Sequence, residues 1–173
     1  MISIIIPVFN SAKTISILVD DIIKTLGENY KFEVILVNDS SRDNSEEKCK
    51  ELVAKYSNIT LFSLSKNVGE HNAIMAGLNK CSGEYAVTMS DDLQHSASAL
   101  QELIKYGIKE KDNFDVVYTH YEKKRDSFLK NLGSKFNGFI ANLLLNKPKS
   151  LYISDFRFIN RLLIDEITKY KFP

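Results

Sequence analysis

Short apolar runs alternate with segments of helical period along the first two thirds of this chain. Five runs are rich in Ile, Val, Phe and Tyr, and most show no alternation of apolar and polar positions: residues 2–6, 32–37, 59–64, 85–89 and 114–118. Runs of this kind are typical of strands that are buried on both faces. The pattern therefore predicts a sheet with both faces covered.

Segments between these runs carry apolar residues at every third or fourth position, as one buried helix face does. The first segment contains Ile15, Leu18, Val19, Ile22, Ile23 and Leu26. The second contains Cys49, Leu52, Val53 and Tyr56, and we expect Asp43 and Asn44 to cap it. Ser98 followed by Gln101 predicts a capping box for a third helix.

Alternation of strands and helices predicts an α/β fold in three layers, with a doubly wound, mostly parallel sheet between helices. Ligands of such folds bind beyond the carboxyl ends of the strands, near the point where the strand order reverses. The residues that follow each strand are therefore the first place to look for chemistry.

Acidic and amide residues follow three of the predicted strands, in segments 7–10, 38–43 and 90–94. Such residues also form turns and helix caps for local reasons, so that interpretation stays open for any single one. Asp39, Asp91 and Asp92 would repel one another at one sheet edge unless a cation lies among them. The sequence has no glycine-rich phosphate loop, so a phosphate-bearing ligand would need a metal ion. Carboxylate and amide oxygens favour Mg2+ or Mn2+ over zinc.

Composition excludes several classes of protein. A chain of 173 residues with 44% hydrophobic residues is typical of one globular domain. The net charge of +1 argues against nucleic acid as a partner. No apolar run approaches the ~18 residues that a membrane span needs. Cys49 and Cys81 lack zinc-site spacing, so we expect free thiols.

Basic residues gather in segment 120–150. This segment holds seven Lys or Arg against two acids, a net charge of +5, which leaves −4 for the remainder of the chain. Its apolar stripe of Phe, Leu and Ile runs beside Lys130 and Lys135, as in helices that lie in a membrane interface. A helix that faces the core with a solvated basic side would show the same pattern, and both interpretations stay open.

Five blocks of residues resemble the family 2 glycosyltransferases with the GT-A fold. Within that family they are most similar to the polyprenyl-phosphate glycosyltransferases, which include dolichol-phosphate mannosyltransferase and the bacterial undecaprenyl-phosphate sugar transferases. The blocks are residues 7–10, 37–43, 67–77, 82–84 and 92–94, and they stand in family order. The resemblance implies one GT-A catalytic domain over residues 1–173 that lacks a C-terminal portion, with segment 120–150 facing the acceptor or the membrane.

The resemblance also implies a role for each matching position. It implies a nucleotide site formed by Pro7, Phe9, Asn10, Val37, Asp39 and Asp91, in which Asp39 contacts the base or the ribose. Asp92 and Gln94 would hold Mg2+ or Mn2+ against the diphosphate of a UDP or GDP sugar. Lys124, Arg125 and Lys135 would bind the acceptor phosphate.

Five positions depart from the family pattern. Two of them are Asn38, at a usual Asp, and Tyr121, at a position that often carries Arg. Ser90 stands where family members commonly carry Asp, Ser11 stands at a usual Glu, and Asp91 stands at a usual Ala. We expect Asp91 either to replace the missing charge or to face solvent. These departures affect the metal site and one nucleotide contact.

The implied reaction transfers a sugar, with inversion, to a polyprenyl phosphate at the cytoplasmic face of the membrane. A phosphate monoester is ionised near pH 7, so this acceptor needs no general base. Transfer to a saccharide hydroxyl in surface polysaccharide synthesis is an alternative, and Asp155 would then be the catalytic base. A nucleotide-binding module without transfer activity is a second alternative, because Ser90 and Ser11 depart from the pattern. The sequence does not determine the sugar, the base or the oligomeric state.

Overall fold

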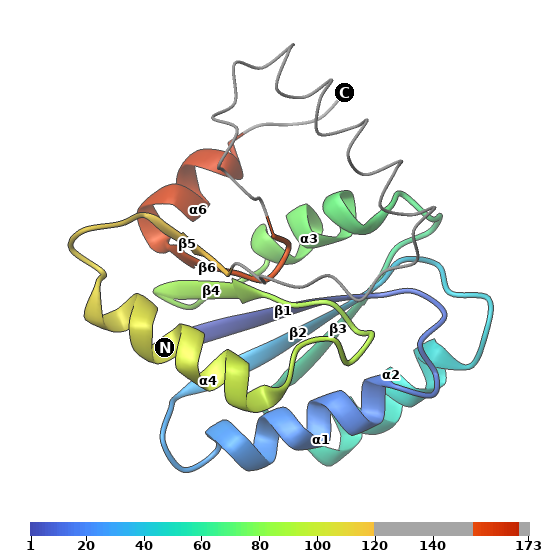
Figure 1. Cartoon of the computed structure of the whole chain (residues 1–173). Coiled ribbons are helices and arrows are strands. Elements are labelled where there is room, and N and C mark those ends of the chain that lie inside the picture. Colours follow the sequence, from blue (N-terminus) through green and yellow to red (C-terminus); the bar gives the residue numbers. More distant parts are fainter. Residues whose placement is uncertain (120–153, 170–173) are drawn as a thin grey trace, which may run out of the picture. The chain divides into compact units, whose positions relative to one another are not determined.

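Within residues 1–119 and 154–169, the part of the chain that this computed structural model describes, six strands form one sheet (Figure 1). β1 (Ile2–Val8) pairs in parallel with β2 (Phe32–Asn38) and β4 (Tyr85–Thr88), and β2 pairs in parallel with β3 (Ile59–Ser63). β6 (Arg157–Asn160) runs antiparallel to β4, and β5 (Val116–Tyr118) completes the order β3-β2-β1-β4-β6-β5. The mostly parallel α/β sheet is confirmed. β6 was not predicted, because four residues are too few to show a period.

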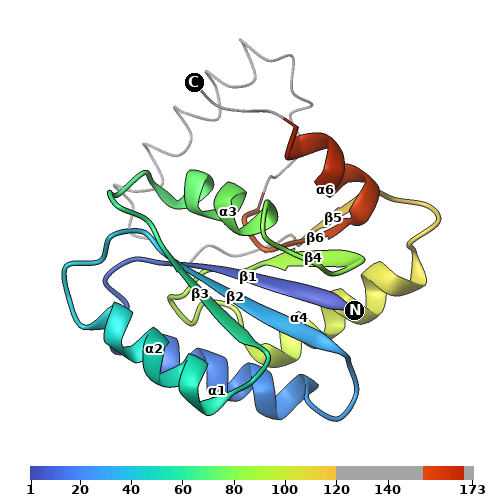
Figure 2. The same cartoon turned by 180° about the vertical axis from the view of Figure 1, so that it is seen from behind.

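Helices cover both faces of the sheet (Figures 1 and 2). α1 (Ile15–Leu26), α2 (Ser45–Lys55) and α4 (Ala97–Lys109) lie on one face, and α3 (Glu70–Leu78) and α6 (Arg161–Ile167) lie on the other. Successive residues of β1 point to opposite faces, so Ile4 and Ile6 join one buried cluster and Ile5 joins the other. The three-layer arrangement is therefore confirmed.

Helix faces follow the predicted pattern more closely than helix ends do. α1 buries Ile15, Leu18, Val19, Ile22 and Leu26. α4 begins earlier than predicted, because Ser96 is its N-cap and accepts a hydrogen bond from the backbone N–H of Ala99 at 3.2 Å. The capping box at Ser98 is therefore wrong. Asn44 does occupy the N-cap of α2, but its side chain makes no capping hydrogen bond.

Gly77 allows α3 to pack directly on β1. A Cβ atom at this position would lie 2.4 Å from Ile5 Cγ2 and 3.2 Å from Val37 Cγ2, so a larger residue would push the helix away. The close approach fixes the position of α3 against the central strand. As a result, the first residue of the helix, Glu70, lies at the carboxyl edge of the sheet.

Both cysteines lie in the described part of the chain. Cys49 and Cys81 are buried and free, as expected. Burial raises the pKa of the Cys49 thiol to about 12, so this thiol stays protonated near neutral pH. Among the described helices, none is long and apolar enough to cross a membrane.

The chain separates into two units, one formed by Met1–Val117 with Asp155–Pro173 and the other by Tyr118–Ser154. Most of the second unit, together with the basic segment 120–150, lies outside the described residues. Lys124, Arg125 and Lys135 belong to that segment, so their predicted roles stay predictions. The expectation of a single domain over residues 1–173 also stays a prediction.

Candidate active site

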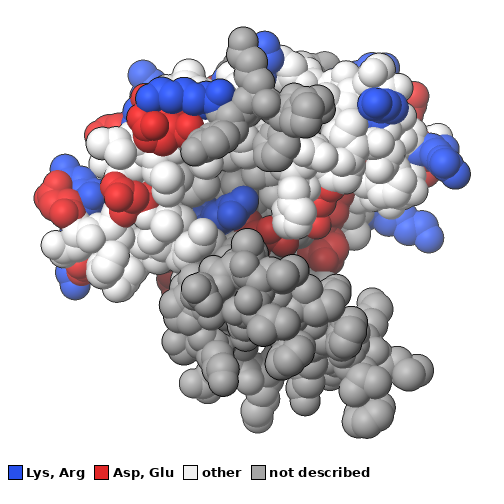
Figure 3. Space-filling view, turned by 90° about the horizontal axis from the view of Figure 1, so that it is seen from above, with Lys and Arg blue, Asp and Glu red and all other residues white. Residues whose placement is uncertain are grey.

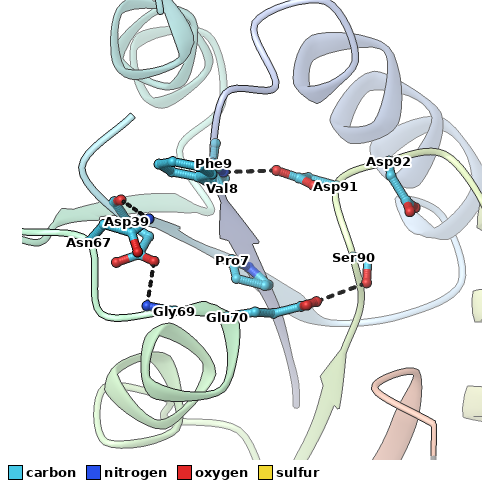
Figure 4. A pocket seen from close by; sticks show the side chains of 10 residues that line it. All are labelled: Pro7, Val8, Phe9, Asp39, Asn67, Gly69, Glu70, Ser90, Asp91 and Asp92. Atoms are coloured by element: carbon cyan, nitrogen blue, oxygen red, sulfur yellow. Dashed lines mark hydrogen bonds between the residues drawn. The ribbon is translucent and has the colours of Figure 1, made fainter. Parts of the chain in front are cut away.

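A pocket opens where β1, β2 and β4 end, and loops from all three contribute to its walls (Figure 4). Its volume is about 350 Å³, within the range of roughly 300–1,000 Å³ found for small-molecule sites. The lining residues are Pro7, Val8, Phe9, Asp39, Asn67, Gly69, Glu70, Ser90, Asp91 and Asp92. Because β1 has β2 on one side and β4 on the other, the pocket lies where the strand order reverses. The fold thus brings together five predicted residues: Pro7, Phe9, Asp39, Asp91 and Asp92.

The loops at this edge of the sheet have unusual backbone geometry. In residues 1–119 and 154–169, three residues other than glycine have a positive φ: Asn10 at 55°, Ser40 at 57° and Leu93 at 62°. Each lies in a loop that follows a strand whose end borders the pocket. A left-handed conformation costs a non-glycine residue on the order of 1–3 kcal/mol, so specific contacts must hold it. Hydrogen bonds support two of these residues: the Asn10 N–H donates to the Ser41 hydroxyl at 3.1 Å, and the Gln94 N–H donates to Asp92 Oδ1 across Leu93 at 3.0 Å.

Asp91 joins the loop after β4 to the loop after β1. Its Oδ2 atom accepts a hydrogen bond from the backbone N–H of Phe9 at 3.0 Å and another from the Ser11 hydroxyl. Burial raises the pKa of the Asp91 carboxyl, and these two hydrogen bonds oppose that shift. Figure 4 shows Asp91 pointing toward Phe9. Asp91 therefore does not simply face solvent, and its charge lies beside Ser11, where a Glu was expected.

We expect Asp91→Ala to weaken nucleotide binding about tenfold, because the hydrogen bonds from the Phe9 N–H and the Ser11 hydroxyl, which hold the loop after β1, are lost. The dependence of that binding on metal should remain. Asp91→Asn is the matched control, since its amide oxygen can still accept the Phe9 N–H. Calorimetric titration with UDP and GDP measures both effects, and loss of metal dependence in Asp91→Ala would contradict the structural role.

Asp39 shapes the loop that leads into α3. Only 2% of its surface is exposed. Its Oδ1 atom accepts a hydrogen bond from the backbone N–H of Val68 at 2.8 Å, and its Oδ2 atom accepts one from Gly69 at 2.9 Å. Gly69 has a φ of 87°, which residues with a side chain rarely adopt. The predicted contact of Asp39 with a base or ribose stays a prediction.

Asp92 is exposed at the opposite side of the Ser90 loop. Its Oδ1 atom accepts a hydrogen bond from the backbone N–H of Gln94 at 3.0 Å, which closes a tight turn around Leu93. In Figure 4 the Asp92 side chain points away from Asp91, so the two neighbouring carboxylates contact different groups. Gln94 is exposed and is not among the pocket-lining residues.

Glu70 is a pocket residue that the sequence did not single out. Its Oε1 atom accepts a hydrogen bond from the Ser90 hydroxyl at 3.1 Å (Figure 4). Partial desolvation raises the pKa of its carboxyl, and the charges of Asp155 and Asp91 raise it further. An acidic residue in the first turn of a helix is common, because it interacts favourably with the helix dipole. Nothing in the sequence therefore separates Glu70 from an ordinary acidic residue at the start of a helix.

Besides Gln94, three predicted site residues in the described part of the chain lie outside the pocket wall. Asp155 pairs with the exposed His71, whose Nδ1 atom is 3.6 Å from Asp155 Oδ1. Val37 is fully buried in the cluster beneath α3, so the structure places its side chain in the core. Asn10 Oδ1 accepts a hydrogen bond from the backbone N–H of Arg42 at 2.8 Å, which ties two loops together. Their predicted roles in binding or catalysis stay predictions.

The charges of the pocket fit a divalent cation. Four of the described lining residues are acidic and none is Lys or Arg. Acidic side chains also lie recessed near the middle of the face drawn in Figure 3. Among the described residues, no group of three or more His, Cys, Asp or Glu side chains is arranged to hold a metal ion. The oxygens of a bound diphosphate would therefore have to complete the coordination of an ion such as Mg2+.

Known proteins resemble this chain over nearly its whole length. CsbB of Bacillus subtilis (strain 168) is 31% identical over 170 residues, which cover 98% of this chain and 51% of CsbB. The undecaprenyl-phosphate 4-deoxy-4-formamido-L-arabinose transferase of Proteus mirabilis (strain HI4320) is 29% identical over 170 residues, 95% of this chain and 50% of that protein. The chain thus spans about half the length of these curated relatives.

A solved structure supports the same fold. The mannosyltransferase PcManGT from Pyrobaculum calidifontis, determined in complex with GDP-Man and Mn2+, superimposes with a TM-score of 0.67 at 18% identity. The alignment covers 96% of this chain and 46% of PcManGT.

The family model described as Glycosyl transferase family 2 matches residues 3–168, which is nearly the whole chain. This chain therefore belongs to glycosyl transferase family 2.

Proposed function

We propose that this chain is the catalytic part of a glycosyltransferase that transfers a sugar from a nucleoside-diphosphate sugar to a polyprenyl phosphate, assisted by Mg2+ or Mn2+. The observation that carries the proposal is the acidic pocket at the strand-order reversal, which four of the five family blocks line together. Anionic walls would repel a diphosphate unless a divalent cation lay between them. The name of the Proteus mirabilis relative supports the lipid phosphate acceptor, and the ligands of PcManGT support the donor and the metal.

Each wall of the pocket has a part in this reaction. Pro7 and Phe9 from the end of β1 would contact the nucleotide, and the buried Asp39 holds the loop opposite them. Asp92, with Gln94 close by in the same turn, would hold the metal ion. A bound divalent ion would stabilise the negative charge that develops on the leaving diphosphate.

The ionised phosphate of the acceptor is itself a nucleophile, so no residue has to remove a proton from it. The chain's task is then to position the two substrates and exclude water. The position of Asp155, paired with His71 and outside the pocket wall, does not favour the alternative in which it activates a saccharide hydroxyl. A lipid acceptor would place the chain at the cytoplasmic face of a membrane, with segment 120–150 at its surface.

Calorimetric titration with UDP and with GDP, each with and without Mn2+, tests the donor site. We expect one nucleotide to bind with at least about tenfold higher affinity when Mn2+ is present, which corresponds to ~1.4 kcal/mol. Equal affinity with and without metal would refute the metal site. Transfer from the matching nucleotide sugar to a short polyprenyl phosphate, compared with transfer to an oligosaccharide, then tests the acceptor.

A further inference from the structure

The hydrogen bond between Ser90 and Glu70 joins two elements that are 20 residues apart in the sequence. Ser90 follows β4 and precedes Asp92 by two positions, while Glu70 is the first residue of α3. In Figure 4 the Glu70 side chain reaches across the pocket toward Ser90. A carboxylate that belongs to α3 is thus held at the end of β4.

The contacts of the four acidic pocket residues separate them into two pairs. Asp39 accepts backbone N–H groups of its neighbouring loop with both oxygens, and Asp91 accepts the Phe9 N–H and the Ser11 hydroxyl. Each of these two carboxylates thus accepts two hydrogen bonds that hold a loop. Among the described residues, Glu70 accepts one hydrogen bond, from the Ser90 hydroxyl, and Asp92 accepts one, from the Gln94 N–H. A carboxylate has about four lone-pair sites, so both side chains keep sites that could bind a metal ion.

Charge gives the same assignment. Glu70 lies within the influence of the negative charges of Asp155 and Asp91, which His71 offsets in part, and the described pocket-lining residues include no Lys or Arg. A residue held there for stability alone would gain from being neutral, because like charges at close range repel. A divalent cation beside Glu70 would offset that repulsion.

We propose that Glu70 supplies the second carboxylate of the metal–diphosphate site, at the place where Ser90 carries no charge, and that Ser90 positions it through its hydroxyl. This inference rests on the proposed function, since it assigns a residue of the same donor site. Family members commonly carry an Asp at the position of Ser90. In this chain the corresponding carboxylate is that of Glu70 in α3, and Asp91 instead holds the loop after β1.

An exchange of the carboxylate between the two positions tests the proposal in the full chain. The variants are Glu70→Gln, Ser90→Asp and the double variant, with Glu102→Gln on the exposed side of α4 as matched control. Mn2+ binding is measured by the loss of the free Mn2+ electron paramagnetic resonance signal, with UDP and with GDP. Thermal unfolding of each variant reports whether the fold is kept.

Glu70→Gln should weaken Mn2+ binding in the presence of nucleotide by at least about tenfold, as loss of a group that supports a metal site does. The double variant should recover most of that loss, and Glu102→Gln should match the unmodified chain. A merely structural Glu70 would lower the unfolding temperature without a selective change in Mn2+ affinity.

Two results would overturn the inference: unchanged Mn2+ affinity in Glu70→Gln, or no recovery in the folded double variant. Failure of the proposed function is a different result, because the unmodified chain would then bind nucleotide without any dependence on Mn2+.

Discussion

Asp92→Asn should lower kcat/KM for sugar transfer by about a hundred- to a thousandfold, the scale seen when one charge-stabilising group is removed from an active site. The amide oxygen of Asn can still accept the Gln94 N–H, so the turn around Leu93 should keep its geometry. The substitution therefore removes the charge of Asp92 and little else. Steady-state rates, together with Mn2+-dependent nucleotide binding, measure the effect.

Asp112→Asn is the matched control for Asp92→Asn. Asp112 is exposed in the turn after α4 and does not line the pocket, so its neutralisation should leave the rate within about twofold of the unmodified chain. If Asp92→Asn kept both its transfer rate and its Mn2+ dependence, Asp92 would not be the metal ligand. The proposal would then have to move the ion to another carboxylate.

Asp39→Ala should destabilise the fold by about 3 kcal/mol, because two hydrogen bonds from backbone N–H groups to a charged acceptor are lost at a buried position. The N–H groups of Val68 and Gly69 would lose these partners next to the first turn of α3. Nucleotide binding should weaken as well, since the loop forms one wall of the pocket. Urea unfolding, monitored by circular dichroism, measures the free energy of unfolding.

Asp39→Asn separates charge from shape at this position. Its single carbonyl oxygen can accept only one of the two bonds well, so we expect a loss of about 1–2 kcal/mol. Asp21→Ala, on the exposed surface of α1, should change the free energy of unfolding by less than ~0.5 kcal/mol. A full-sized effect at Asp21, or none at Asp39, would contradict the view that Asp39 is a structural clamp.

Sequence reasoning succeeded where the signal was local. The apolar stretch of β1 and the periodic face of α1 need only neighbouring residues to be recognised, and both are confirmed. The strand pattern predicted that Asp39 and Asp92 follow two strands whose carboxyl ends the fold brings together, and the structure places both in one pocket. Helix starts were less certain, since Ser96 and Ser98 are equally suitable caps and only one can be at the first turn.

The chain by itself determined the layers of the fold and the edge of the sheet at which the acidic and amide residues gather. Only the tertiary structure decided what each carboxylate does. Asp91 bonds to Phe9, and Glu70 bonds to Ser90, across separations of 82 and 20 residues. The physical reason is that the spacing of apolar residues along the sequence, which predicts helices and strands, involves only residues close together in the chain. The partner of a carboxylate depends instead on which loops the strand order brings together.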